Sequence, residues 1–489
     1  MRAKTAELIF CLALLPATLA STCDPVANCE NGESCSQNLS VLEATPRLSK
    51  SEGGTFVVTV DNPKGDITTG ATLLLLDASG QELASTPLGQ IESKEPVHAK
   101  FSVLPDKLRN LPVGPLSLSV TVAGTNARGN TQTRLYVKPI LSTGAVLEKT
   151  SLATSGEEVL SLESVFIQPA SGQLGWLFLG QHYKRNMNIY RRIQRRQCRP
   201  CNNTQCRQCA GMMYDAQPFT TESRLSGQDP AVRFAVGQTT VAVGWRDAGT
   251  SKVRVFGQNA NADAMLDKLP DGSNSVMPLF AADPDGDTLA LATPSKLQLY
   301  TVKASGTTIS QSLSGTCALP PEYPPIALLI QPVDTAREKL RRAIVVGSNG
   351  TDLVVKVCEL PNATQEGATT VLRENTPLAD CLKSRLEKLP RKNAVLALGD
   401  LDADGLADLV YVPNDSTSHI DYAPYAVGPD PNRPLGTTDC PFWPTQRAAL
   451  PEAAPGTVSL AVGDLDGDLT PDVAMTTSEK LFVFKNKAK

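Results

Sequence analysis

The chain has 489 residues, of which 41% are hydrophobic and 20% are charged, so it is long enough for two or three domains and too apolar for a mainly disordered protein. Its formal net charge of −4 gives no overall reason to expect nucleic acid as a partner. The histidines, His98, His182 and His419, lie far apart in the sequence, which argues against a local histidine-based metal motif.

Residues 1–22 have the layout of a secretory signal peptide. Arg2 and Lys4 precede an apolar run at residues 8–15, and small residues follow up to Ala20. The run is too short to span a bilayer permanently. We therefore expect an exported protein that resides outside the cell or at its surface.

The cysteines agree with export. The chain has 12, and setting Cys11 in the leader aside leaves an odd number. Cys23 follows the leader at the place where a bacterial lipoprotein carries its acylated cysteine, although the preceding Leu19 and Thr22 depart from the usual lipobox. The alternatives are a bacterial outer-membrane lipoprotein attached through Cys23 and a soluble secreted protein cleaved after Ala20. The other cysteines are candidates for disulfides in an oxidising compartment: Cys29, Cys35, Cys198, Cys201, Cys206, Cys209, Cys317, Cys358, Cys381 and Cys440.

Residues 23–45 are short, polar and cysteine-bearing, which favours a disulfide-pinned linker. From 46 to 140 the pattern changes to alternating apolar and polar residues separated by Gly, Asn and Asp turns. That pattern predicts a small β-sandwich. This region resembles a bacterial immunoglobulin-like domain without the paired core cysteines of antibody domains, and such a domain is expected to act as a spacer.

Residues 141–489 repeat a strand, a turn and a second strand. The turns fall near residues 170, 237, 285, 336, 402 and 466, roughly 50 to 70 residues apart. Repeats of that length are typical of four-stranded propeller blades, which bury their faces only by packing against one another. The chain is therefore predicted to be all-β, an immunoglobulin-like β-sandwich followed by a β-propeller. The propeller has six blades, or seven if the strands near residues 145–165 form one more.

Two of these turns carry four aspartates at positions 1, 3, 5 and 9: Asp400, Asp402, Asp404 and Asp408 in one, and Asp464, Asp466, Asp468 and Asp472 in the other. Carboxylates held this close repel one another unless a cation lies among them, and such hard oxygen ligands favour Ca²⁺. An EF-hand is excluded because position 12 is Tyr411 or Met475 instead of glutamate and the flanks alternate like strands. A third turn keeps Asp283, Asp285 and Asp287 as candidate metal ligands.

These turns resemble the FG-GAP (VCBS-type) repeat of integrin-α-like β-propellers, most closely in the last two repeats. The resemblance implies that each loop joins two strands of one blade and that Ca²⁺ has a structural role there.

Residues 184–222 are expected to form a Cys/Arg-rich insertion that projects from the first blade. Cys198, Cys201, Cys206 and Cys209 have zinc-like spacing, but outside the cell they favour two local disulfides. The nearby arginines suit either a solvated charged loop or a patch for polyanions. The candidate polyanion-binding residues are Arg191, Arg192, Arg195 and Arg196.

Anchor, spacer and propeller together favour a calcium-binding adhesion or ligand-binding protein, whose partner is a surface polymer, a glycan or a protein. The alternative is a secreted polysaccharide-processing enzyme, a lyase or glycosidase, on the same scaffold. The sequence contains neither a nucleophile elbow nor a histidine-based metalloprotease motif, and its distinctive carboxylates already belong to the acidic loops. We therefore expect a binding protein with no catalytic residues.

Overall fold

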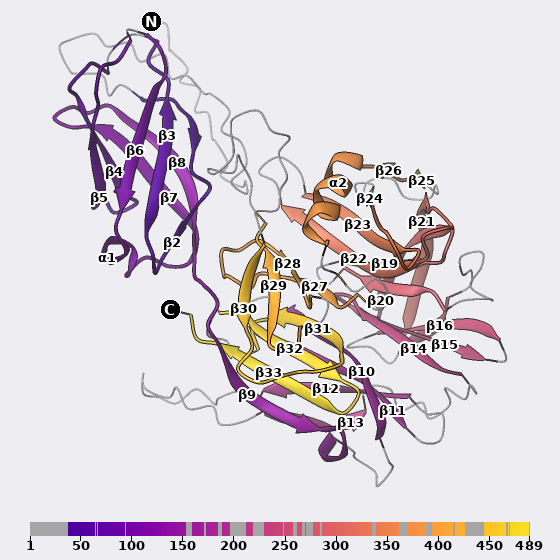
Figure 1. Cartoon of the computed structure of the whole chain (residues 1–489). Coiled ribbons are helices and arrows are strands. Elements are labelled where there is room, and N and C mark those ends of the chain that lie inside the picture. Colours follow the sequence, from indigo (N-terminus) through magenta and orange to yellow (C-terminus); the bar gives the residue numbers. More distant parts are fainter. Residues whose placement is uncertain are drawn as a thin grey trace, which may run out of the picture.

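The computed structural model describes residues 38–63, 65, 67–92, 94–152, 159–170, 173–183, 188–195, 212–218, 229–247, 249–257, 262–266, 269, 277–283, 286–334, 339–360, 370–387, 389, 394–413, 416–425, 445–465, 468 and 470–488. Almost all of the secondary structure in these ranges is strand, so the all-β prediction is confirmed (Figure 1).

Residues 38–137, the N-terminal unit, form two sheets. One sheet has the strand order β1-β3-β6 and the other the order β2-β8-β7-β4-β5. The elements are β1 (Val41–Ala44), β2 (Arg47–Ser49), β3 (Gly54–Val60), β4 (Thr72–Asp77), β5 (Glu82–Pro87), β6 (Val97–Val103), the short helix α1 (Pro105–Leu108), β7 (Gly114–Val122) and β8 (Arg128–Tyr136).

Both sheets contribute side chains to a single core. In β6 every second residue is buried, from Val97 to Val103, and the residues between them are exposed. This alternation is the pattern of strands with one face on a core and one in water. Phe56 and Phe101 are fully buried there with ring centroids 6.5 Å apart. The core therefore fixes the strand register, because a shift of one residue would expose these rings.

Residues 141–488, the C-terminal unit, form six further sheets in the described part of the chain. In each sheet the first three strands follow one another as antiparallel neighbours. Sheet 1 has β10 (Val159–Ala170), β11 (Gln173–Tyr183), β12 (Asn188–Arg195) and β13 (Met212–Pro218); sheet 2 has β14 (Asp229–Val236), β15 (Thr240–Asp247), β16 (Thr250–Gly257) and β17 (Asp263–Met265).

The other four sheets follow the same order along the chain. Sheet 3 has β18 (Leu279–Ala282), β19 (Thr288–Ala292), β20 (Lys296–Ser305), β21 (Thr308–Ala318) and the added β25 (Thr370–Val371); sheet 4 has β22 (Pro325–Asp334), β23 (Lys339–Ser348), β24 (Leu353–Glu359) and β26 (Arg373–Glu374). Sheet 5 has β27 (Leu396–Gly399), β28 (Asp408–Tyr411), β29 (His419–Ala423) and β30 (Gln446–Ala449); sheet 6 has β31 (Thr457–Gly463), β32 (Asp472–Thr477), β33 (Lys480–Asn486) and β9 (Leu141–Glu148).

The first strands of the six sheets form a closed ring of contacts. Each of them touches the first strand of the next sheet, in the order β10, β14, β18, β22, β27 and β31, and β31 touches β10 again. Separate hydrophobic clusters lie between consecutive sheets, for example between sheets 5 and 6 and between sheets 6 and 1. Strands such as β28 and β32 are accordingly buried along their whole length, because both of their faces are covered.

The last sheet combines the two ends of the C-terminal unit. Strand β9 pairs with β33 from Glu148 opposite Lys480 to Leu141 opposite Asn486. The chain end therefore lies beside the connection between the two units (Figure 1). The strands near residues 145–165 do not form a seventh sheet, since β9 belongs to sheet 6 and β10 to sheet 1.

Two predicted boundaries are wrong in the described residues. Strand β1 pairs with β3, although its residues were expected to belong to the 23–45 linker. The strand is short and of mixed polarity, so its sequence does not show the alternation that predicts a strand. The segment 184–222 is not simply an insertion, because its strands β12 and β13 are the third and fourth strands of sheet 1. The backbone of β12 pairs with β11, and the many arginines in its sequence hid the strand.

Outside the sheets, the described helical elements are short. They are α1, the 3₁₀ turn Lys149–Leu152 and α2 (Thr376–Arg385), whose N-terminus is capped by the Asn375 side chain accepting a hydrogen bond from the Leu378 N–H. Leu378 and Leu382 of α2 are buried against the cluster between sheets 4 and 5. No helix in the described ranges is both long and apolar enough to cross a membrane.

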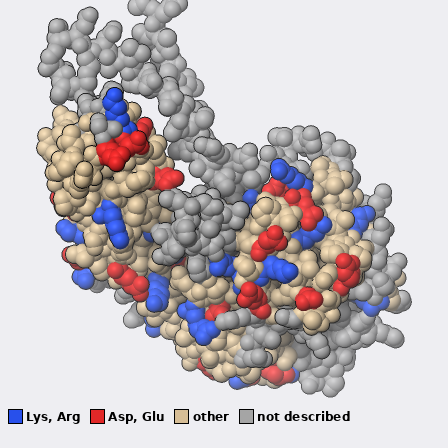
Figure 2. All heavy atoms as spheres, turned by 45° about the horizontal axis from the view of Figure 1, so that its top comes forward, with Lys and Arg blue, Asp and Glu red and all other residues tan. Residues whose placement is uncertain are grey.

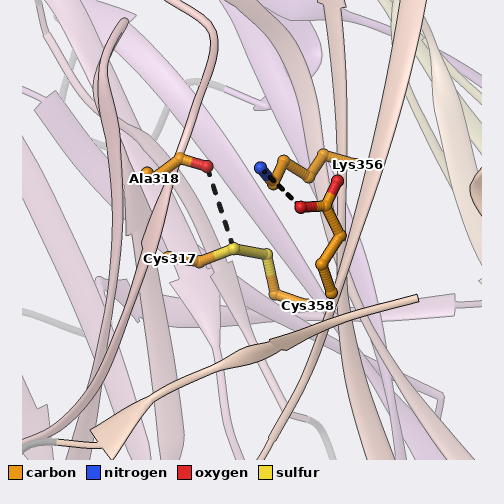
Figure 3. The surroundings of a disulfide bond; sticks show 5 residues. Cys317, Ala318, Lys356 and Cys358 are labelled. Atoms are coloured by element: carbon orange, nitrogen blue, oxygen red, sulfur yellow. Dashed lines mark hydrogen bonds and ion pairs between the residues drawn. A yellow bond between two sulfur atoms is a disulfide. The ribbon is translucent and has the colours of Figure 1, made fainter. Parts of the chain in front are cut away.

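A disulfide links sheets 3 and 4. Cys317 on β21 and Cys358 on β24 are both buried and bonded to each other, as two of the predicted disulfide candidates (Figure 3). The Lys356 ammonium forms an ion pair with Glu374 beside it, at 3.0 Å. Cys381 on α2 is also disulfide-bonded. The candidates Cys29, Cys35, Cys198, Cys201, Cys206, Cys209 and Cys440 lie outside the described residues.

Replacement of Cys317 and Cys358 by alanine should lower the melting temperature. The bond closes a sequence separation of 41 residues, and the chain-entropy model gives a loss of about 2–4 kcal/mol for a loop of that size. Thermal unfolding monitored by circular dichroism measures the effect. The double variant should lose no more stability than either single variant, and a larger loss in the double variant would contradict the pairing.

Candidate metal centre

The two complete acidic loops occupy equivalent places in neighbouring sheets. Residues 400–408 connect β27 to β28 in sheet 5, and residues 464–472 connect β31 to β32 in sheet 6. The partial loop at 283–287 likewise connects β18 to β19. All three therefore join the first and second strands of a sheet, as the repeat pattern predicted.

The aspartates at positions 5 and 9 shape both loops through the same hydrogen bonds. The Leu401 N–H donates to Asp408 Oδ2 at 2.9 Å, and the Leu465 N–H donates to Asp472 Oδ2 at 3.2 Å. Asp404 accepts from Leu406 N–H as Asp468 accepts from Thr470 N–H, each at 2.9 Å. These side chains replace backbone partners that a tight turn cannot supply.

The position-9 carboxylates also attach each loop to the end of the third strand of its sheet or to the residues just after it. Asp408 Oδ1 accepts from the Tyr425 N–H and Asp472 Oδ1 from the Asn486 N–H, both at 3.1 Å. Asn486 further donates through its side-chain amide to the Leu401 carbonyl at 3.1 Å. The two acidic loops are thus connected through a single asparagine at the end of β33.

In the loop at 400–408 three carboxylates converge. Asp400, Asp402 and Asp408 each offer an oxygen within 4.8 Å of the others. Within the described part of the chain, Asp400 Oδ1 and Asp402 Oδ1 are buried without a hydrogen-bond partner. Gly405 follows with a φ of 87°, a left-handed conformation that suits glycine and turns the backbone sharply. Convergent oxygens with unused acceptor capacity fit a hard divalent cation such as Ca²⁺.

The electrostatics of this loop also favour a bound cation. Burial, together with the carboxylates of Asp404 and Asp402, raises the pKa of Asp400 to about 8. Burial and Asp402 raise the pKa of Asp404 to about 7, and burial with its three neighbouring aspartates raises the pKa of Asp408 well above its usual value. Burial and mutual repulsion therefore disfavour the charged forms of these carboxyls, and a bound metal ion would favour them.

The N-terminal unit already supplies one positively charged side chain, Arg47, to this loop. The guanidinium of Arg47 on β2 contacts Asp402 Oδ2, and its Nη1 lies 3.3 Å from Asp404 Oδ2. These three side chains are at most 1% exposed. Burial raises the pKa of Asp402 although Arg47 opposes the shift. Arg47 was not predicted from the sequence as a residue of this site. The one local signal was its position in a strand directly before the apolar Leu48.

Neighbouring residues of β8 extend this contact. The Arg47 guanidinium lies 3.8 Å above the centre of the Tyr136 ring, which supports it by a cation–π interaction. Arg134 Nη1 donates to the Asp404 carbonyl at 2.7 Å, and the Val137 N–H donates to the Asp402 carbonyl at 2.9 Å. The N-terminal unit is therefore docked directly on the acidic loop.

The partial loop at 283–287 also faces an arginine. Asp283 is fully buried, and its Oδ2 lies 2.6 Å from Nη1 of Arg341 on β23 of the next sheet. Asp287 accepts from the Thr239 hydroxyl and lies 3.7 Å from the Lys303 ammonium. Asp285 in this loop and Asp466 in the loop of sheet 6 lie outside the described residues.

Several other predicted site residues have no described side-chain environment. Cys23, Arg196 and the signal peptide fall outside the described ranges. Arg191, Arg192 and Arg195 lie on β12, where the backbone pairs with β11. Their proposed role in polyanion binding stays a prediction.

A Ser–His–Asp set on sheet 5 bears on the enzymatic alternative. Ser416 Oγ lies 2.9 Å from Nδ1 of His419, whose Nε2 lies 3.8 Å from Asp421. The Ser416 hydroxyl also bonds the backbone N–H and carbonyl of His419, and Asp421 pairs with Arg447 at 3.1 Å. The hydroxyl contacts are those of a local turn between Ser416 and His419.

In the presence of a chelator, the protein should become more stable as the pH falls. The folded-state pKa of Asp400 is about 8 and its ordinary value is 3.8, so the folded state binds more protons than the unfolded state between these values. The resulting stabilisation is complete below pH 4 and is lost as the pH rises through about 8. Asp400→Asn should flatten the melting-temperature profile relative to wild type, and Asp106→Asn, at an exposed aspartate, should not. Parallel profiles for wild type and Asp400→Asn would contradict the assignment.

No protein-family model matches the chain, and no curated protein matches it. Among solved structures, the chain is similar to the complex of the fission yeast SREBP-SCAP binding domains, with a TM-score of 0.28 and 9% sequence identity over 83% of this chain and 99% of that chain. A similarity this weak establishes neither the fold family nor the function of this chain.

Proposed function

We propose that the protein is an exported, calcium-binding β-propeller protein that acts as a surface adhesion or ligand-binding module. In this proposal the C-terminal unit is a six-bladed propeller of the FG-GAP type and the N-terminal unit is an immunoglobulin-like β-sandwich. The ring of first-strand contacts and the pairing of β9 with β33 support the propeller. The two sheets over one core support the sandwich.

The convergence of Asp400, Asp402 and Asp408 carries the calcium assignment. The ion would be held by these carboxylates, and loop 464–472 is its second proposed site because its position-5 and position-9 aspartates make the same hydrogen bonds. When bound, calcium would neutralise the repulsion within a turn that joins the first two strands of a sheet. Its proposed role is therefore to stabilise the structure.

A binding role agrees with the distribution of charge. Figure 2 shows lysine, arginine, aspartate and glutamate side chains interspersed over the described surface of one face. Such a face gives no support to nucleic-acid binding, which requires a clustered basic surface. The proposed partner remains a surface polymer, a glycan or a protein. Export remains part of the proposal, with attachment through Cys23 and soluble secretion as its two alternatives.

Calcium should raise the melting temperature, and Asp400→Asn and Asp464→Asn should each remove part of that increase. At calcium concentrations 100-fold above the dissociation constant, one site contributes about 2.7 kcal/mol. Differential scanning calorimetry with excess calcium or excess chelator measures the effect. Asp106→Asn serves as the control and should retain the full increase. Equal melting temperatures of wild type with and without calcium would disprove the calcium site.

Ligand binding can be tested on an array of glycans and bacterial surface polymers, probed with the full chain in calcium and in chelator. We expect selective binding that decreases in chelator. The same polymers incubated with the protein and analysed for released reducing or unsaturated ends test the alternative. Bond cleavage without retained binding would overturn the adhesion proposal in favour of an enzyme.

A further inference from the structure

Asp402 lies between the Arg47 guanidinium and the proposed position of the calcium ion. Its Oδ2 contacts the Arg47 guanidinium, and its Oδ1 is buried without a hydrogen-bond partner. The carboxylates of Asp400 and Asp408 converge on the same aspartate. A metal ion among these three carboxylates would therefore share Asp402 with a guanidinium from the N-terminal unit.

Two cations bound to one carboxylate weaken each other. A divalent ion and a guanidinium a few ångströms apart repel each other appreciably even in the partly screened environment of a protein. When the loop carboxylates are ionised they attract both cations, and each cation that binds reduces the negative charge available to the other. Because the coupling between two binding events is reciprocal, calcium must loosen Arg47 by the factor by which Arg47 weakens calcium.

Docking of the N-terminal unit depends on the same loop. Besides the Arg47 pairs, the Val137 N–H donates to the Asp402 carbonyl and Arg134 donates to the Asp404 carbonyl. Val137 also packs in a small cluster with Ala403 and Ala488. These contacts all involve residues of the turn that would hold the ion, so the ion would lie directly beside the interface.

We propose that Arg47 is a calcium-sensitive latch: its guanidinium and a divalent cation compete for Asp402, and calcium binding loosens the N-terminal unit from the acidic loop. This inference rests on the proposed calcium site. At low calcium, Arg47 clamps the two units together; at high calcium, the N-terminal unit becomes more mobile relative to the C-terminal unit.

The first test is a calcium titration of the full chain by isothermal calorimetry. Every protein in this titration carries the substitutions Asp464→Asn and Asp468→Asn. They reduce calcium binding at the loop 464–472, so that the titration reports on the loop 400–408. In this background, Arg47→Gln, which removes the charge but keeps a polar side chain, should bind calcium on the order of tenfold more tightly. Arg47→Lys keeps the charge and should bind calcium more weakly than Arg47→Gln. Arg109→Gln, at an exposed arginine of the same unit, should bind like the parent.

The second test follows docking in the wild-type chain by hydrogen–deuterium exchange, so it does not depend on whether a variant folds. Calcium should accelerate exchange in the segment 131–140, which contains the Val137 amide. It should slow exchange in the loop 400–408. A peptide from β4, in the core of the N-terminal unit, should exchange at the same rate with and without calcium.

The two proposals fail in different ways. If no protein in the series binds calcium, the proposed calcium site is wrong, and the proposal that Arg47 is a latch is wrong as well. If calcium binds but Arg47→Gln has the same affinity as its parent or a weaker one, the latch is overturned and the calcium site stands. Slower exchange of segment 131–140 in calcium would also overturn the latch, because it would show that the ion tightens the docking.

Discussion

The fold of this protein depends on burying several carboxylates in a single tight turn. Asp402, Asp404 and Asp408 are fully buried within a few residues of one another. Burial of like charges is strongly unfavourable unless cations and hydrogen-bond donors surround them. Part of the requirement is met by the Leu406 N–H, which donates to Asp404, by the Leu401 N–H, which donates to Asp408, and by the Arg47 guanidinium at Asp402. The oxygens left over, on Asp400 and Asp402, are the reason to propose an ion.

This turn influences structure far beyond its own sheet. It joins the first and second strands of sheet 5, is tied through Asn486 to the end of β33, and receives the N-terminal unit through Arg47. Sheet 6 depends in turn on β9, which follows the N-terminal unit directly in the chain. The last strands of the protein, the connection between the units and the acidic loop are therefore mechanically linked. A change in the charge of the loop acts on all three.

The sequence predicted the hairpins of the C-terminal unit because their signal is local. Strands β27 and β28 flank Asp400–Asp408 where the apolar runs end, and β31 and β32 flank the second loop in the same way. The strands that were missed are short, polar or rich in charge, such as β17, β26 and β12. Their pairing is determined by a neighbouring strand, and a strand of two or three residues has no periodicity of its own. The predicted linker ended too late because β1 has only four residues, of mixed polarity, and is recognised only through its pairing with β3.

The all-β character and the spacing of the aspartates were determined by the sequence alone, since both follow from residues a few positions apart. Gly405 has a φ of 87° in the structure, a conformation that glycine adopts without strain. The tertiary structure decided which groups meet across the chain. Arg47 and Asp402 are 355 residues apart, and Cys317 pairs with Cys358 across two sheets. No local pattern in the sequence encodes such partners, because they are brought together by the packing of whole sheets. For the same reason, only the tertiary structure shows that β9 pairs with β33 and completes sheet 6.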